Sequence, residues 1–151
     1  MKNILEPDAQ QEIFGRIEKL TPNTQRQWGT LSVEGMMAHC TDQLRVANNQ
    51  RQLKKPPFFV GLMGKIIIYP LLLGVPMGKN SPTAPELDQN KKGTKAQDFT
   101  TEKNNLVQSI NSFLSTPNNN TPHPFFGKLS KNEWARLAYL HLNHHLTQFG
   151  V

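Results

Sequence analysis

The sequence predicts an all-α protein: a four-helix bundle with a long irregular connection between helices 2 and 3. Four stretches place apolar side chains at the spacings of an amphipathic helix, and no stretch shows the alternation of a half-buried strand. A length of 151 residues is typical of one domain with one core, so residues 1–151 are expected to form a single helical bundle domain. The mean hydropathy is low, at -0.54, but the apolar residues occur in blocks, which favours a folded core with long loops.

The first two helices are expected near the N-terminus. Residues 8–20 form the first, because their apolar positions recur at helical spacing and Pro22 closes the segment. The second begins near Ser32, a favourable N-cap, and ends at Asn48 and Asn49. The apolar face of this second helix consists of Met36, Met37, Cys40, Leu44 and Ala47.

Residues 51–97 are expected to connect helices 2 and 3 irregularly, since they are rich in proline, glycine and polar residues. Their most apolar run, residues 58–75, is interrupted by Lys65, Pro70 and three glycines, so we expect no membrane span there, although part of residues 60–73 could be helical. This run, with Phe58 and Phe59, is expected to pack on the bundle, to cover an apolar ligand channel or to form a dimer contact.

The last two helices frame a second loop. Residues 98–115 show helical periodicity and form the third helix, and residues 116–129, with three prolines and a run of asparagines, form a loop. The fourth helix opens at Ser130, which stands three residues before Glu133 in the capping-box pattern, and its apolar positions continue to the end of the chain.

The composition narrows the class of protein. Cys40 is the single cysteine, so there is no internal disulfide and any metal must be held by His, Asp or Glu. The N-terminal stretch has no apolar region of signal-peptide length, which makes a cytoplasmic location the expectation. The net charge is +6, but the lysines are scattered in loop-like sequence without interleaved aromatic residues, so no nucleic-acid partner is expected.

Three of the five histidines lie within HLNHHLTQFG, residues 141–150. His141 and His145 are one helical turn apart and could point at one cation, although such a pair is also common on a solvated helix face. A tight divalent site needs a third donor, and His39 in the second helix suits this better than His123 in a proline-rich loop, because a helix holds a ligand more rigidly. A site of three neutral imidazoles is therefore favoured, with coordination positions left open as in reactive metal centres.

Several neighbours of these histidines have two interpretations. Asp42, Gln43 and Gln148 lie on the same helix sides as the proposed ligands and could orient an imidazole or act on a bound water, or they could belong to an ordinary polar face. His144 projects away from His145 and is expected to flank the site or to lie on the surface.

Cys40 and the two tryptophans also have two interpretations each. Cys40 follows His39 directly, but adjacent helical residues do not face each other, so core packing is favoured over a catalytic thiol. Trp28 and Trp134 are expected to anchor the core or to line a pocket at the mouth of the bundle.

The ordered set of His39, His141, His145 and Gln148, a histidine in the second helix followed by H-x-x-x-H-x-x-Q in the fourth, resembles the DinB-like superfamily of metal-binding four-helix proteins. The stretches WGTLSVEGMMAHCTDQL and HPFFGKLSKNEWARLAYLHLNHHLTQFG are similar to a branch catalogued only as a domain of unknown function. The resemblance covers most of the chain apart from residues 51–97.

This resemblance implies that the three histidines bind a divalent metal such as zinc or nickel, often within a homodimer. Characterised relatives in the superfamily include transferases and isomerases that use a thiol cofactor. The expected function is therefore that of a metal-binding protein acting as a metal-dependent hydrolase or a thiol-dependent transferase on an unknown small molecule. The alternative is a non-catalytic helical bundle, a stress-related dimer that binds a metal or an apolar ligand.

Overall fold

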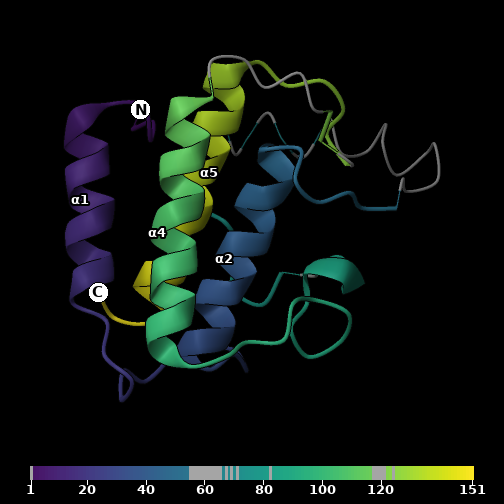
Figure 1. Cartoon of the computed structure of the whole chain (residues 1–151). Coiled ribbons are helices and arrows are strands. Elements are labelled where there is room, and N and C mark those ends of the chain that lie inside the picture. The colour runs from purple at the N-terminus through teal and green to yellow at the C-terminus, as the bar shows by residue number, and fades with distance from the viewer. Residues whose placement is uncertain are drawn as a thin grey trace.

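The structure, a computed structural model, describes residues 2–54, 66, 68, 70, 72–81, 83–116, 122, 123 and 125–151. These residues form four long helices and no strand, which confirms the predicted all-α fold (Figure 1). The helices are α1 (Pro7–Glu18), α2 (Val33–Ala47), α4 (Phe99–Ser115) and α5 (Lys131–Gln148), and a short 3-10 helix, η1 (Pro85–Leu87), lies in the connection between α2 and α4.

Side-chain caps set the starts of three helices. The Ser32 hydroxyl accepts a hydrogen bond from the Gly35 N–H, and Asp98 caps α4 in the same way through the Thr101 N–H. At α5 the predicted capping box is present: the Ser130 hydroxyl accepts from the Glu133 N–H, and the Glu133 carboxylate accepts from the Ser130 N–H at 2.7 Å. These local bonds explain why the predicted helix starts agree with the structure within a residue or two.

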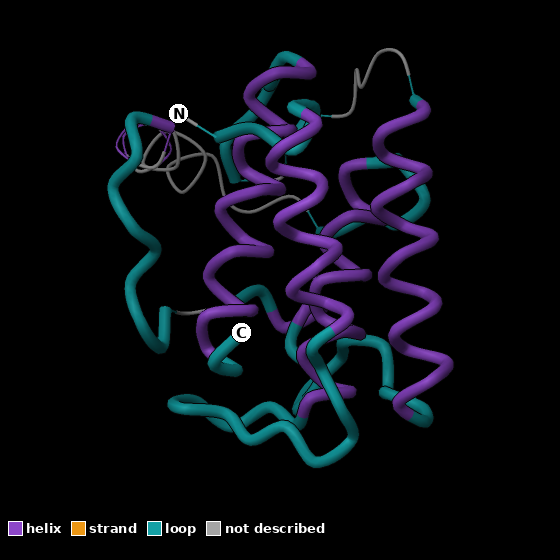
Figure 2. Tube along the Cα trace, turned by 90° about the vertical axis from the view of Figure 1, so that its left-hand side faces the viewer, coloured by secondary structure: helices purple, strands orange, loops and turns teal. Residues whose placement is uncertain are grey.

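The long connection follows from the directions of the helices. In Figure 1, α1 and α5 run downward while α2 and α4 run upward, and α2 packs more extensively on α4 than on any other described element. Neighbouring parallel helices cannot be joined by a short turn, because the chain must first return over the length of α2, about 22 Å. Figure 2 shows loop segments of the chain running along the outside of the helices.

The core lies between the four helices. Its fully buried side chains come from every helix and include Ile13, Ile17, Met36, Met37, Leu106, Ile110, Phe113 and Trp134. Trp134 is therefore the core anchor that the sequence predicts, whereas Trp28 is partly exposed. Cys40 is buried beside Met36, with the two sulfur atoms 3.9 Å apart, and burial raises the pKa of its thiol. These observations favour core packing for Cys40 over a role as nucleophile.

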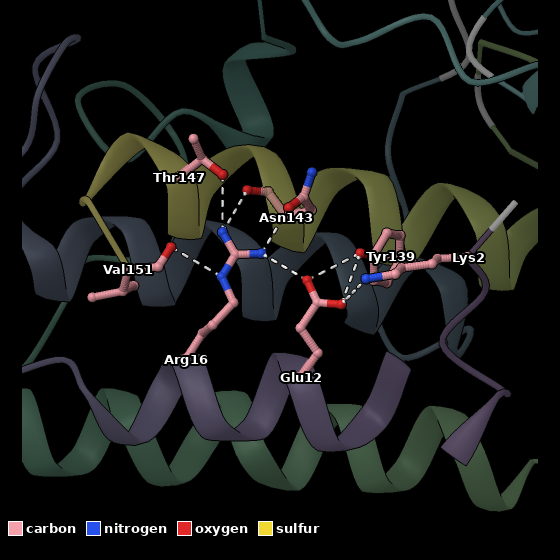
Figure 3. A network of polar contacts seen from close by, with 7 residues as sticks. All are labelled: Lys2, Glu12, Arg16, Tyr139, Asn143, Thr147 and Val151. Carbon is pink, nitrogen blue, oxygen red and sulfur yellow. Dashed lines mark hydrogen bonds and ion pairs between the residues drawn. The ribbon is translucent and has the colours of Figure 1, made fainter. Parts of the chain in front are cut away.

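A polar network joins α1 to α5 along one side of the bundle (Figure 3). The Arg16 guanidinium donates to the side-chain oxygen of Asn143 at 2.6 Å and to the Thr147 hydroxyl at 2.9 Å. The network also contains Lys2, Glu12, Tyr139 and Val151. It occupies the face of α5 that is turned toward α1, which leaves another face of α5 for the histidines.

Most of the apolar run at residues 58–75, with Phe58 and Phe59, lies outside the described residues. Residues 66, 68, 70 and 72 are helical, with Ile68 and Leu72 buried against the core and Ile66 exposed. Among the helices in the described ranges, none combines the length and the hydropathy that crossing a membrane requires.

Candidate metal centre

The structure brings His39 of α2 together with His141 and His145 of α5. One ring nitrogen from each histidine lies within 4.8 Å of the others, and the Nε2 atoms of His39 and His141 are 3.0 Å apart. The three ring centroids are 4.6 to 4.9 Å from one another, so the imidazoles surround a common point. These three side chains could hold a metal ion.

A backbone carbonyl sets the tautomer of His39. Its Nδ1 lies 2.7 Å from the carbonyl oxygen of Leu87, the last residue of η1. Because a carbonyl oxygen can only accept, Nδ1 must carry the proton and donate it. The lone pair of His39 is therefore on Nε2, the atom that faces His141 and His145.

Gln148 sets the tautomer of His145, and a backbone carbonyl in turn orients Gln148. The Gln148 amide nitrogen donates to the Trp28 carbonyl oxygen at 2.8 Å, which places Oε1 toward His145 Nδ1, also at 2.8 Å. That oxygen accepts, so His145 Nδ1 carries the proton and the lone pair of its Nε2 remains free. Gly29 makes room for this amide: its φ is +81°, and a Cβ there would lie 2.5 Å from the Gln148 nitrogen.

The electrostatics keep all three imidazoles neutral at pH 7. Burial is the largest cause and lowers the pKa of each ring, to about 3 for His145, while the neighbouring histidines lower the pKa of His141 and His145 further. Neutral imidazole is the form that coordinates a metal, so the site needs no loss of protons before an ion binds.

One pair of donors has nearly the spacing of a tetrahedral ion. Zinc takes imidazole nitrogens at about 2.0–2.1 Å, which separates two nitrogens of a tetrahedral site by roughly 3.3 Å. The separation of 3.0 Å between His39 Nε2 and His141 Nε2 is within a few tenths of an ångström of that value. His141 is held less firmly than the other two, since its Nδ1 is buried without a hydrogen-bond partner among the described residues.

The three histidines lie at a cavity of ≈ 630 Å³. This volume is within the range of small-molecule sites. Loop residues before α2 and in the connection between α2 and α4 supply most of the remaining wall, including Trp28, Thr30, Asn80, Asn90 and Lys91, and Phe126 is added by the loop before α5. The candidate metal centre is thus next to a space large enough for a small molecule.

Asp42 is engaged away from the imidazoles. It is fully buried, and its carboxylate accepts hydrogen bonds from Arg51, Gln89 and both the backbone and the hydroxyl of Thr94. Arg51 also donates to the Glu86 carbonyl oxygen at 2.7 Å, immediately before Leu87. Asp42 therefore fastens the connection to α2 and so holds Leu87 in place. Its charge also acts on His39 and raises the pKa of that ring, against the larger lowering by burial.

The other polar candidates differ in how closely they approach the site. Gln148 is hydrogen-bonded to His145, whereas the buried Gln43 has a side-chain oxygen without a partner in the described ranges. His144 lines the cavity and packs edge-on against Trp28, with ring centroids 5.9 Å apart.

His123 lies apart from the three-histidine cluster. Its ring stacks on Phe126 with centroids 4.2 Å apart, and its Nδ1 accepts from the N–H groups of Phe125 and Phe126 at 3.2 Å. Burial lowers the pKa of His123 to about 4. Its contacts are those of a residue that shapes the loop before α5.

The sequence indicated Gln148 as a residue that could orient an imidazole, but not the other groups that do so. Leu87 and Trp28 act through carbonyl oxygens, which every residue possesses, so no residue type marks them. Arg51 and Gln89 lie in the connection, whose path could not be derived from periodicity.

A family model described as "Protein of unknown function (DUF1569)" matches residues 2–150, so the chain belongs to that family. This confirms the resemblance to a branch known only as a domain of unknown function. No curated protein and no solved structure matches the chain.

Proposed function

We propose that this member of the family is a divalent-metal-binding protein in which His39, His141 and His145 hold the ion. The observation that carries the proposal is the convergence of three neutral imidazoles whose nitrogens lie within 4.8 Å of one another. Two of the rings are turned by hydrogen bonds at Nδ1 so that Nε2 faces the common point. A histidine on a solvated face has no need of such fixed orientation, whereas metal ligands are regularly held in this way.

Three features support a reactive centre. The ligands are three in number, they are neutral, and they line a cavity that a small molecule could enter. A divalent ion held there would supply Lewis acidity and lower the pKa of a bound water or thiol. We propose zinc or nickel as the ion, and hydrolysis or transfer to a thiol cofactor as the reaction.

The residues of this chain have definite tasks in that proposal. His39, His141 and His145 bind, the Leu87 carbonyl and Gln148 orient two of them, and the cavity wall positions the substrate. Asp42 does not serve as general base, because Arg51 and Thr94 already bond to its carboxylate.

Elemental analysis tests the metal site. Protein purified without an affinity tag, as isolated and after reconstitution with zinc or nickel, should contain close to one equivalent of metal. A variant with His39, His141 and His145 all changed to alanine should remain helical by circular dichroism and lose the metal. Absence of metal from the reconstituted parent, or equal content in the folded triple variant, would refute the proposal.

A turnover screen separates catalysis from binding alone. The metal-loaded parent should convert at least one member of a panel of amides, esters and thiol conjugates, and removal of the metal should abolish that turnover. Full metal content with no turnover across the panel would instead favour the alternative, a non-catalytic metal-binding bundle.

We propose that the chain is one domain of the DinB-like superfamily, which the histidine pattern supports, and that it lies in the cytoplasm. The resemblance to that superfamily also supports a homodimer. Sedimentation velocity of the metal-loaded protein tests the dimer directly.

A further inference from the structure

We propose that the cavity beside the three histidines binds a small organic oxyanion, whose acid group pairs with Lys79 and whose body packs against Trp28. This inference rests on the proposed metal site for part of its positive charge. The contribution of Lys79 does not depend on the metal, which allows the two to be tested separately.

The histidine ligands carry no negative charge, and the two carboxylates nearest to them are each paired with a cation. Three neutral imidazoles would leave the full charge of a divalent ion in place, unlike a site with a carboxylate ligand. Asp88 is the carboxylate in the described wall of the cavity, and it is paired with Lys91 at 3.0 Å and accepts from the Asn90 N–H. The nearby Asp42 is paired with Arg51.

Lys79 adds a positive charge at the rim. Its ammonium nitrogen lies 4.5 Å from the ring centroid of Trp28, and its neighbours Gly78 and Asn80 line the cavity. Throughout the described ranges, no carboxylate lies within ion-pair distance of Lys79. An oxyanion could therefore approach this ammonium group without first displacing an acidic partner.

Aromatic rings connect Lys79 to the histidine cluster. The Trp28 ring packs against His144 at 5.9 Å between centroids, and His144 packs against His145 at 5.1 Å. Trp28, His144 and His145 all line the cavity, so an apolar or flat part of a ligand would lie on this wall. With a cavity of ≈ 630 Å³, the ligand class is a small molecule.

Titration calorimetry with matched probes tests the ligand class. Benzoate and phenyl phosphate carry an acid group on a flat ring, and benzamide is the neutral counterpart of benzoate. We expect both anions to bind the zinc-loaded parent at least about tenfold more tightly than benzamide does. The ratio between benzoate and phenyl phosphate then shows whether the site prefers a carboxylate or a phosphate.

Substitutions of Lys79 measure the contribution of its charge to anion binding. Lys79→Met keeps the aliphatic stem on Trp28 but removes the charge, and it should weaken anion binding by about threefold to tenfold without changing benzamide binding. Lys79→Arg should restore most of the affinity. Lys103→Gln removes the same net charge from α4, where Lys103 pairs with Glu18, and should have no effect because salt screens distant charges.

The outcomes distinguish the two proposals. Equal affinity of the parent for benzoate and benzamide, absence of binding by every probe, or equal losses in Lys79→Met and Lys103→Gln would overturn the anion proposal. If the parent never takes up metal, the proposed function fails. The same titrations of metal-free protein must then still show the difference between Lys79→Met and the parent for the anion proposal to stand.

Discussion

The orientation of each fixed imidazole depends on one polar atom outside its own ring. His39 relies on the Leu87 carbonyl oxygen and His145 on Gln148, which in turn relies on the Trp28 carbonyl oxygen. Both carbonyls belong to segments that also build the cavity wall. At the residue scale, the geometry of the candidate ligands is therefore tied to the loops that would contact a substrate.

Gly29→Ala tests whether the loop before α2 controls the orientation of His145 through Gln148. The added Cβ would lie 2.5 Å from the Gln148 amide nitrogen, at a φ that strains any L side chain, so Gln148 must shift away from His145. We expect zinc affinity to fall by about tenfold, measured by competition with a chromogenic chelator.

Gly15→Ala is the matched control for that substitution. Nothing lies within 4 Å of a Cβ at Gly15, which is in α1, so the change should raise stability by about 0.5–1 kcal/mol through helix propensity. Its zinc affinity should equal that of the parent. Equal affinities in both glycine variants would contradict the account of Gln148.

At the scale of elements, α5 has two polar faces with different tasks. Tyr139, Asn143 and Thr147 recur every four residues and meet Glu12 and Arg16 of α1 (Figure 3). A second face carries His141, His145 and Gln148 toward α2 and the cavity. The first face fixes α5 in the bundle, and the second presents the ligands.

Arg51 holds the connection between α2 and α4 in place by hydrogen bonds, as Arg16 holds α5. Removing the guanidinium would leave the buried Asp42 without its ionic partner and release the Glu86 carbonyl beside Leu87. We expect Arg51→Gln to cost about 3 kcal/mol in urea denaturation and to reduce zinc affinity by about tenfold. If this variant does not fold, the Asp42→Asn/Arg51→Gln double variant removes both charges and serves for the affinity measurement.

Arg16→Gln provides the comparison for Arg51→Gln. It removes the hydrogen bonds by which Arg16 of α1 holds the facing side of α5, and it should cost about 1–2 kcal/mol. Because the histidines lie on another face, its zinc affinity should be unchanged. Loss of affinity in proportion to lost stability in both variants would mean that Arg51 acts only on the fold.

Periodicity and capping predicted the elements better than their connections. Ser32, Ser130 and Glu133 mark helix starts by local hydrogen bonds, which a sequence displays directly. The length of the connection depends on α2 and α4 being parallel, an arrangement that core packing across the bundle determines. His141 and His145 could therefore be selected from their spacing and His39 from its place in a helix, whereas the Asp42 contacts with the connection could not be foreseen.

At the scale of the whole molecule, buried neutral histidines make stability depend on pH. The folded pKa of His123 is about 4, below its ordinary value of 6.5, and the pKa values of the three clustered imidazoles are also lowered. At a pH between 6.5 and the lowered pKa of each histidine, the unfolded chain binds a proton at that histidine and the folded chain does not. The contribution of these histidines to stability is therefore full above about pH 6.5 and is lost as the pH falls through their folded pKa values, about 4 for His123 and about 3 for His145.

His123→Asn tests one part of this dependence. The asparagine oxygen can still accept from the Phe125 and Phe126 N–H groups but does not titrate in this range. In metal-free protein, the urea midpoint of the parent should fall from pH 7 to pH 5, and the variant should show a smaller fall. An identical fall in parent and variant would show that His123 does not contribute.

The central claim is that His39, His141 and His145 together hold one metal ion. Anomalous diffraction at the zinc edge, from crystals of zinc-loaded protein, tests it most directly. We predict one anomalous peak, which marks a zinc ion at about 2.0–2.1 Å from Nε2 of each of the three histidines. A peak on other residues, or no peak at this cluster in crystals that contain zinc, would contradict the account.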